Sequence, residues 1–163
     1  MGLGGINQLE NAMVSVLCAE KLGISHKSIE EGLRIAQNPA RFDKVGDNII
    51  FDGGHNPSGV STLKANLDRY YPDEKPIFIM ASMRDKDIKR NLEIIKDKAS
   101  EIRFVKVKNN ERSANPDTLK KIAKEIGIDA KGYENLELAL NDTEKSLVVI
   151  CGSLYLYKDF REI

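Results

Sequence analysis

The residues best suited to chemistry stand together at positions 52–59, which read DGGHNPSG. This segment follows a short apolar run, and its two adjacent glycines let the backbone turn sharply or approach a ligand closely. Because a proline suits the first turn of a helix, the segment predicts a loop between a strand and a helix. Asp52 would stand at the strand tip, where a carboxylate can accept hydrogen bonds from both hydroxyls of a ribose. His55 would lie on the loop beside the helix start.

Simpler interpretations of these residues remain open at this point. Asp52 could cap the turn that follows it, and a single histidine such as His55 is more often a turn residue than a catalyst. A metal site is not expected, because no second His or Cys stands at ligand spacing from His55. The other histidine, His26, falls at the expected start of a helix and is interpreted as a solvated residue.

Three further segments carry polar residues that suit the same site. Arg41 follows a Pro-Ala pair near an expected domain junction, where its forked guanidinium could bind a phosphate. Residues 82–87, SMRDKD, follow the second apolar run, although their mixed charges are also typical of a solvated surface. Ser153 follows the last apolar run. Ligands of open α/β sheets bind at the carboxyl ends of strands, so we expect these loops at one rim.

The elements that must position these residues alternate regularly along the chain. Short apolar runs with β-branched residues predict strands at residues 48–52, 77–81, 102–107, 130–133 and 147–151. Apolar residues at helical spacing predict helices at residues 60–67, 88–95, 119–126, 136–140 and 155–160. This alternation predicts an α/β, Rossmann-like domain with a mostly parallel sheet and helices on both faces.

The start of the chain has a different pattern and predicts two helices. Apolar residues recur at helical spacing in the first of them, and Asn7 with Glu10 matches a capping box at its start. Ser25 is a typical N-cap for the second helix. We therefore divide the chain into a helical segment, residues 1–38, and an α/β domain, residues 39–163.

Bulk composition argues against several classes of function. The 163 residues include 25 Lys plus Arg and 25 Asp plus Glu, so the formal net charge is zero. A neutral chain is not expected to bind nucleic acid or an anionic membrane as its main task. No apolar run approaches the roughly 20 residues that span a bilayer, and no secretory signal pattern opens the chain. With two isolated cysteines, the chain is expected to be cytoplasmic.

Taken together and in order, the motifs resemble those of the folylpolyglutamate synthase/dihydrofolate synthase family of the Mur ligase superfamily. Residues 39–43, PARFD, and 52–57, DGGHNP, are similar to the family's Pro-Gly/Ala-Arg-hydrophobic-acidic and Asp-Gly-Ala-His-Asn-Pro elements. Further elements of the family resemble residues 5–12, 83–87 and 152–155, so the resemblance covers nearly the whole chain. Where the family commonly has His, Trp and Ala, this chain has Asn7, Asn38 and Gly54.

The resemblance implies an ATP-dependent ligase that adds glutamate to folate through an acyl phosphate. It implies that Asn11 contacts the base region of ATP, that Arg41 binds the phosphates and assists catalysis, and that Asp52 binds the ribose. His55, a second catalytic candidate, and Ser153 would hold the incoming glutamate. ATP with magnesium is the cofactor implied for a full-length parent, and no cofactor is expected to bind tightly to this chain alone.

The phosphate-binding loop of such a ligase does not occur in this sequence, which contains no GxxxxGK[ST] segment. We therefore expect a carboxyl-terminal domain that acts with a missing N-terminal ATPase domain on ATP, L-glutamate and folate. Alone, it is expected to be a monomer without ligase activity. Two alternatives remain: the matching domain of a Mur-type cell-wall amino-acid ligase, and a non-enzymatic α/β binding module. The glycine pair before His55 favours the folate ligase over the first alternative.

Overall fold

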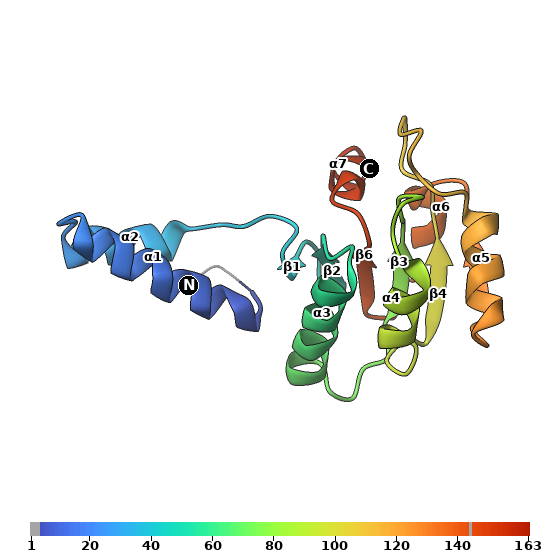
Figure 1. The fold of residues 1–163 in the computed structure, drawn as a ribbon, viewed down its shortest axis with the longest axis horizontal. Helices are drawn as coiled ribbons and strands as arrows, with labels where there is room; N and C mark the ends of the chain where they lie inside the picture. The colour runs from blue at the N-terminus through green and yellow to red at the C-terminus, as the bar shows by residue number, and fades with distance from the viewer. Residues whose placement is uncertain (1–3, 144) are drawn as a thin grey trace.

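A six-stranded mixed sheet forms the centre of the α/β part of the chain (Figure 1). The structure is a computed structural model that describes residues 4–143 and 145–163. The strands are β1 (Asp43–Lys44), β2 (Ile49–Asp52), β3 (Ile77–Met80), β4 (Glu101–Phe104), β5 (Ala130–Gly132) and β6 (Val148–Cys151). Their order in the sheet is β1-β2-β6-β3-β4-β5, and every pair is parallel except β1 with β2. The expected mostly parallel sheet is therefore confirmed.

The register brings the carboxyl ends of four strands into one line. Asp52 of β2 pairs with Cys151 of β6, which pairs with Met80 of β3, and Met80 also pairs with Phe104 of β4. Although β6 is last in sequence, it lies between β2 and β3, so the strand order reverses there. Ligands of open α/β sheets bind beside such a switch point. The loops after β2, β3 and β6 are therefore in the expected place for a site.

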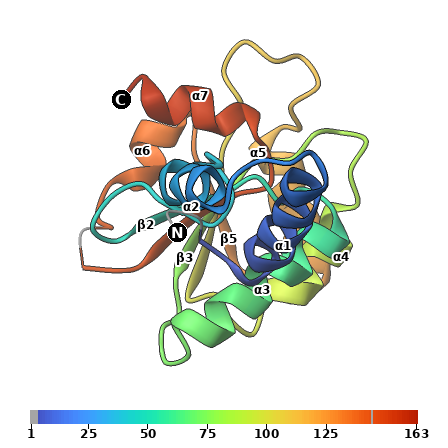
Figure 2. The ribbon, with the colours of Figure 1, turned by 90° about the vertical axis from the view of Figure 1, so that its left-hand side faces the viewer.

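Helices cover both faces of the sheet (Figure 2). The helices of the α/β part are α3 (Pro57–Tyr70), α4 (Ile88–Ile95), α5 (Pro116–Glu125), α6 (Leu136–Leu140) and α7 (Tyr155–Arg161). In β2, Ile50 joins the core that includes α3, α4 and α5, whereas Phe51 joins the core that includes α6 and α7. Burial on both sides accounts for the near-continuous apolar runs in the strand sequences.

Local signals determine where these helices begin. The side chains of Asn56, Asp87, Asn115 and Asn135 cap α3, α4, α5 and α6, and each accepts a hydrogen bond from a backbone N–H of the first turn. Pro57 occupies the first turn of α3, as expected. The sequence pattern does not predict β1, because a strand of two residues is too short to show a period.

Two further helices precede the sheet and form a hairpin. They are α1 (Ile6–Lys21) and α2 (His26–Ile35), and α2 has the expected serine N-cap. The capping box expected at Asn7 is wrong, because the N-cap of α1 is Gly5, which has a φ of 97° and no side chain to accept a hydrogen bond. The N–H of Ile6 instead donates to Oδ1 of Asn66 in α3, at 2.8 Å. None of the helices formed by the described residues is long and apolar enough to cross a membrane.

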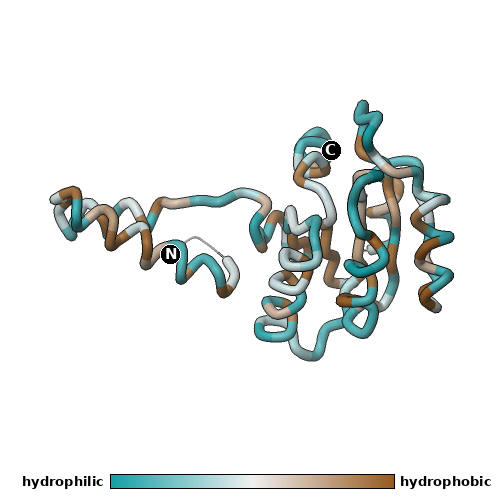
Figure 3. Tube along the Cα trace, in the orientation of Figure 1, coloured by the Kyte–Doolittle hydropathy of each residue, from teal (hydrophilic) through white to brown (hydrophobic). Residues whose placement is uncertain are grey.

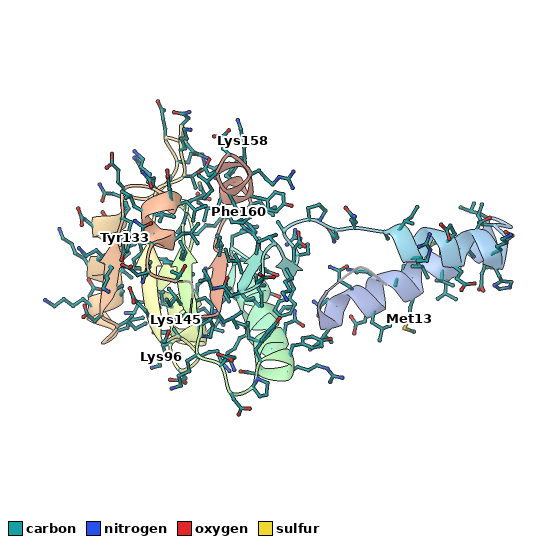
Figure 4. All side chains as sticks on the ribbon, turned by 180° about the vertical axis from the view of Figure 1, so that it is seen from behind. Met13, Lys96, Tyr133, Lys145, Lys158 and Phe160 are labelled. Atoms are coloured by element: carbon teal, nitrogen blue, oxygen red, sulfur yellow. The ribbon has the colours of Figure 1, made fainter. Side chains whose placement is uncertain are left out.

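The hairpin projects from the rest of the chain and leaves apolar side chains uncovered (Figure 1). Leu9, Val14 and Leu17 of α1 are each 61% exposed, and Met13 is 59% exposed. Figure 3 shows hydrophobic stretches along both helices, and Figure 4 labels Met13 at a place well apart from the sheet. An apolar helix face of this kind normally packs against a partner. The assignment of residues 1–38 to a separate domain stays a prediction.

A matched pair of leucine substitutions tests the division between core and hairpin. Leu92 of α4 is fully buried, so Leu92→Ala is expected to lower the free energy of unfolding by about 2–5 kcal/mol. Leu17→Ala, the same change on the exposed face of α1, is expected to change it by at most about 0.5 kcal/mol. Urea unfolding of the 163-residue chain measures both values. A large loss for Leu17→Ala would mean that this face is packed in solution.

Candidate functional site

A polar cavity of about 520 Å³ opens at the carboxyl end of β2. It lies between the start of α1, the segment before β1 and the start of α3. Among the described residues that line it, Arg41 is the only cation and Asp52 the only anion. The sequence-predicted residues Asn11, Arg41 and Asp52 all line this cavity, whereas His55 and Ser153 do not. The predicted site residues therefore fall into two groups.

Asp52 is 8% exposed, and both of its carboxylate oxygens accept backbone hydrogen bonds. Oδ2 accepts from the N–H of Phe42 at 2.9 Å, and Oδ1 accepts from the N–H of Gly54 at 2.7 Å. Burial raises the pKa of Asp52, while the Gly54 and Phe42 amides and the Arg41 guanidinium oppose that rise. Because the pKa of Asp52 is higher in the folded chain than in the unfolded chain, protonated Asp52 stabilises the fold. This contribution is fully present at pH values below the unfolded-state pKa. It is lost as pH rises through the native pKa.

Arg41 is an exposed residue on a loop whose backbone is held at several points. Ala40 and Phe42, on either side of it, have φ values of 59° and 49°, in the left-handed region. The N–H of Gly53 donates to the Ala40 oxygen at 2.8 Å, so the loop runs alongside the end of β2. A Cβ at position 53 would overlap the side chain of Leu154, which would have to move to make room for it. Within the described residues, the Arg41 side chain makes no hydrogen bond or salt bridge.

Asn11 reaches the cavity from the second turn of α1. Its Nδ2 donates to Oε1 of Gln8 at 3.3 Å, and Gln8 is buried. Asn7 also lines the cavity, with its Nδ2 3.5 Å from Oγ1 of Thr62 in α3. The amino-terminal ends of α1 and α3 therefore meet here, and helix N-termini attract negative charge. Together with Arg41, they make the cavity suitable for an anionic ligand such as a phosphate.

His55 is partly buried on the loop between β2 and α3. Its Nδ1 lies 3.0 Å from the oxygen of Gly53, and because a carbonyl can only accept, Nδ1 carries the hydrogen. Nε2 is therefore the ring atom left to meet a ligand. The His55 backbone oxygen accepts a hydrogen bond from Nδ2 of Asn91 in α4 at 3.3 Å, which fixes the position of this loop.

Ser153 follows β6 and belongs to a loop that adjoins the His55 loop. The N–H of Gly152 donates to the Gly54 oxygen at 2.9 Å, so the two loops are joined. Ser153 is 4% exposed, and its Oγ accepts a hydrogen bond from the N–H of Tyr155 at 3.2 Å, at the start of α7. The acceptor capacity of this hydroxyl is thus partly used by the helix start, and its O–H remains a potential donor.

Two buried asparagines support the site, and neither of them is predicted from the sequence. Asn66 is 2% exposed and accepts from the Ile6 N–H, which ties α1 to α3. Asn91 is 1% exposed and holds the His55 backbone, and its Oδ1 has no hydrogen-bond partner in the described ranges. Both stand at helical spacing from buried apolar residues of their own helix, where another apolar residue is expected. A polar residue inside an apolar stripe is the signal that could have identified them.

A larger cavity, of about 800 Å³, lies beyond the ends of β4 and β5 and contains none of the predicted site residues. Its lining contains two Lys side chains and five Asp or Glu side chains, so it is acidic and does not suit an anionic ligand. Within residues 4–143 and 145–163, no group of three or more His, Cys, Asp or Glu side chains is placed to hold a metal ion.

Arg41→Met tests the electrostatic interaction between Arg41 and Asp52. The Arg41 cation opposes the rise in the pKa of Asp52, so its removal is expected to raise that pKa further. Arg41→Lys retains the charge and is the matched control, for which a smaller rise is expected. A carbon-13 NMR titration of the Asp52 carboxyl group in the isolated chain measures both effects. An unchanged midpoint in Arg41→Met would show that the two groups do not interact.

Sequence comparison relates the chain to known proteins. A family model described as dihydrofolate synthetase, C-terminal domain, matches residues 38–163. The folylpolyglutamate synthase of Lacticaseibacillus casei is 30% identical over 142 residues, which make up 85% of this chain and 32% of that protein. The chain thus spans about a third of the length of this curated relative.

Solved structures with the same fold are also longer than this chain. The folylpolyglutamate synthase of Thermotoga maritima matches 98% of this chain and 39% of its own, with a TM-score of 0.84 and 31% identity. The Mycobacterium tuberculosis folylpolyglutamate synthase, complexed with ADP and AMPPCP, matches 98% of this chain and 40% of its own. Its TM-score is 0.86 and its identity is 19%, so this second match bears on the fold alone. Since the family model matches most of its length, the chain belongs to the family of dihydrofolate synthetase C-terminal domains.

Proposed function

We propose that this chain is the carboxyl-terminal domain of an ATP-dependent ligase that adds glutamate to folate. The main support is that Asn11, Arg41 and Asp52, the residues to which the family resemblance assigns ATP, line one cavity beside the switch point of the sheet. The chain also belongs to the matching family, and the relatives named above are folylpolyglutamate synthases. Because the chain spans only part of them, the activity is proposed for a full-length parent.

The parent would catalyse amide formation through an activated carboxylate. ATP would transfer its γ-phosphoryl group to a carboxylate of the folate or dihydropteroate substrate, which gives an acyl phosphate and ADP. The amine of L-glutamate would then attack the acyl carbon, and phosphate would leave as the C–N bond forms. The proton lost by the attacking nitrogen would pass to a base or to solvent. The products are the amide, ADP and phosphate.

The cavity suits the phosphoryl-transfer step. Negative charge that develops on the transferred group would be stabilised by the Arg41 guanidinium and by the helix N-termini that meet at the cavity. Asn11 would contact the base region of the nucleotide. Asp52 would accept from the ribose with the lone pairs that its two backbone hydrogen bonds leave available.

His55 and Ser153 would act in the second step, on glutamate. Nδ1 of His55 is held by Gly53, so Nε2 could accept a hydrogen bond or a proton from the glutamate ammonium group. Ser153 could donate its hydroxyl hydrogen to a glutamate carboxylate. Both residues lie outside the cavity that Arg41 lines. This separation suits an amine that must approach the acyl phosphate from a side not occupied by the nucleotide.

Magnesium would be held mainly outside this chain. It is usually bound by one or two carboxylates together with substrate phosphates. Asp52 is the single carboxylate among the described residues that line the cavity, and no group of three or more His, Cys, Asp or Glu side chains in the described ranges is placed to hold a metal ion. When bound with ATP, the metal would neutralise phosphate charge. We therefore assign the metal ligands, with the phosphate-binding loop, to the missing N-terminal ATPase domain.

The N-terminal ATPase domain would also cover the hairpin of α1 and α2. A groove of about 480 Å³ runs between α1 and α2 and is lined largely by apolar and small side chains. Beside it, the exposed residues Leu9, Met13 and Leu17 form an apolar face on α1. We infer that residues 1–38 are the end of the ATPase domain and that the complete parent, with this face covered, is a monomer.

Two other functions are less well supported. A Mur-type cell-wall ligase would share the fold, but the matching family is that of dihydrofolate synthetase. A non-enzymatic α/β module would need no ATPase domain. An assay of ADP release by the parent separates the three functions. Release with folate substrates supports the folate ligase, release with cell-wall precursors supports the Mur-type ligase, and release with neither supports the non-enzymatic module.

Substitutions in the full-length parent test the assigned roles. Arg41→Ala is expected to lower kcat about 10²–10³-fold, the usual loss when one group that stabilises transition-state charge is removed. His55→Ala is expected to raise the KM for glutamate while the KM for ATP stays the same. Arg161→Ala, at an exposed position near the end of α7, is the control and should keep normal activity. Normal turnover of Arg41→Ala would contradict the catalytic role of Arg41.

The isolated chain is expected to release no ADP from ATP, with or without glutamate and folate. The physical reason is that neither a phosphate-binding loop nor a set of metal ligands is supplied by residues 4–143 and 145–163. A coupled assay of ADP release measures this, with the full-length parent as the positive control. Glutamate-dependent hydrolysis by the chain alone would contradict the prediction.

A further inference from the structure

The backbone around Arg41 has an unusual conformation. Both neighbours of Arg41, Ala40 and Phe42, have φ values in the left-handed region, at 59° and 49°. Residues with a Cβ rarely adopt this region, because the Cβ comes too close to the following carbonyl oxygen. Two such residues within three positions persist only where surrounding contacts hold them.

Three hydrogen bonds hold this loop. The N–H of Phe42 donates to Oδ2 of Asp52 at 2.9 Å, and the N–H of Gly53 donates to the Ala40 oxygen at 2.8 Å. The N–H of Ala40 donates to Oδ2 of Asp43 at a longer distance, 3.3 Å. Asp52 and Asp43 are both carboxylate acceptors, and a bond to an ionised carboxylate is stronger than one between neutral groups, but the bond to Asp52 is buried and shorter than the bond to Asp43. The bond to Asp52 is therefore the stronger of the two carboxylate contacts that hold the loop.

The ring of Phe42 adds an anchor on the other side of the loop. It is 9% exposed and belongs to the core that includes α3, with its centroid 5.8 Å from that of Tyr70 and 6.4 Å from that of Tyr71. The Arg41 side chain, in contrast, is exposed and makes no hydrogen bond or salt bridge in the described part of the chain. The conformation of the backbone is thus what directs Arg41 to the cavity.

We propose that Asp52 is a positioning residue for Arg41: its carboxylate clamps the loop of residues 39–43 and thereby holds the guanidinium at the cavity. The second oxygen of Asp52 accepts from the N–H of Gly54, so the same carboxylate joins this loop to the segment that carries His55. The catalytic consequence rests on the proposed function, whereas the clamp itself does not. The role goes beyond a contact between Asp52 and a ribose, since the clamp consists of hydrogen bonds within the chain itself.

Asp52→Asn tests the clamp in the isolated chain. Asparagine has nearly the same shape but one acceptor oxygen and one NH₂ group, so it cannot accept from both backbone amides. Amide hydrogen exchange of Gly53, and of Phe42 or Gly54, is expected to accelerate about tenfold or more, while exchange in α5 stays the same. Asp117→Asn, at an exposed carboxylate in α5, is the matched control and should leave the loop unchanged. Unchanged protection of Phe42, Gly53 and Gly54 in Asp52→Asn would overturn the proposal.

A measurement on the unmodified chain covers the case in which Asp52→Asn does not fold. Protonation of Asp52 weakens it as an acceptor, so the amide proton shifts of Phe42 and Gly54 should follow the titration of the Asp52 carboxyl carbon with the same midpoint. Amide shifts that do not change through that titration would also overturn the clamp.

A double-mutant cycle in the full-length parent tests the consequence for catalysis. If Asp52 acts through Arg41, Asp52→Asn should lower kcat, and the Asp52→Asn/Arg41→Ala double variant should lose no more activity than Arg41→Ala alone. A role limited to ribose binding predicts a higher KM for ATP and losses that multiply, and this outcome would overturn the positioning role. If the parent has no ligase activity at all, the proposed function fails, and the exchange experiment still decides the clamp.

Discussion

Parallel pairing between β2 and β6 is the constraint on which the site depends. It sets Asp52 opposite Cys151, and the loops that follow these two residues are then close enough for the Gly152 N–H to reach the Gly54 oxygen. A slip of one residue would turn every side chain of β2 to the opposite face. Asp52 would leave the cavity and Phe51 would leave its core cluster. The register that places Ile50 and Phe51 in their two core clusters therefore also places Asp52 at the cavity.

A nearly buried carboxylate costs free energy unless hydrogen bonds replace its hydration. For Asp52 the replacement comes from two backbone N–H groups on different segments, so the compensation also joins those segments. The left-handed residues beside Arg41 add local strain, which the same contacts offset. The burial of the Asp52 carboxylate, the strain in the loop beside Arg41 and the position of the Arg41 guanidinium are thus linked through the Asp52 side chain. Such a link suits the proposed role of Arg41, because a guanidinium that is held in place beforehand needs no reorganisation when charge develops beside it.

The parts of the fold that follow from local patterns could be predicted, and the parts that depend on distant contacts could not. Buried parallel strands such as β3 and β6 form unbroken apolar runs, and the cap of α2 at Ser25 is a local signal. The cap expected at Asn7 is wrong because the start of α1 is fixed by Asn66, about 60 residues away in sequence. Nothing local indicates that the Phe42 amide would reach Asp52, or that Ala40 would have positive φ. Only the family resemblance predicts that Asn11 lies at the same site as Arg41 and Asp52.

The two edge strands of the sheet are short. β1 contributes two residues at one edge, and β5 contributes three at the other. An edge strand of this length offers few free backbone groups to an incoming strand, which protects against aggregation by strand pairing. The uncovered helices of the hairpin have no such protection. Self-association of the isolated chain would therefore proceed through helix side chains, and its β-sheet content would not increase.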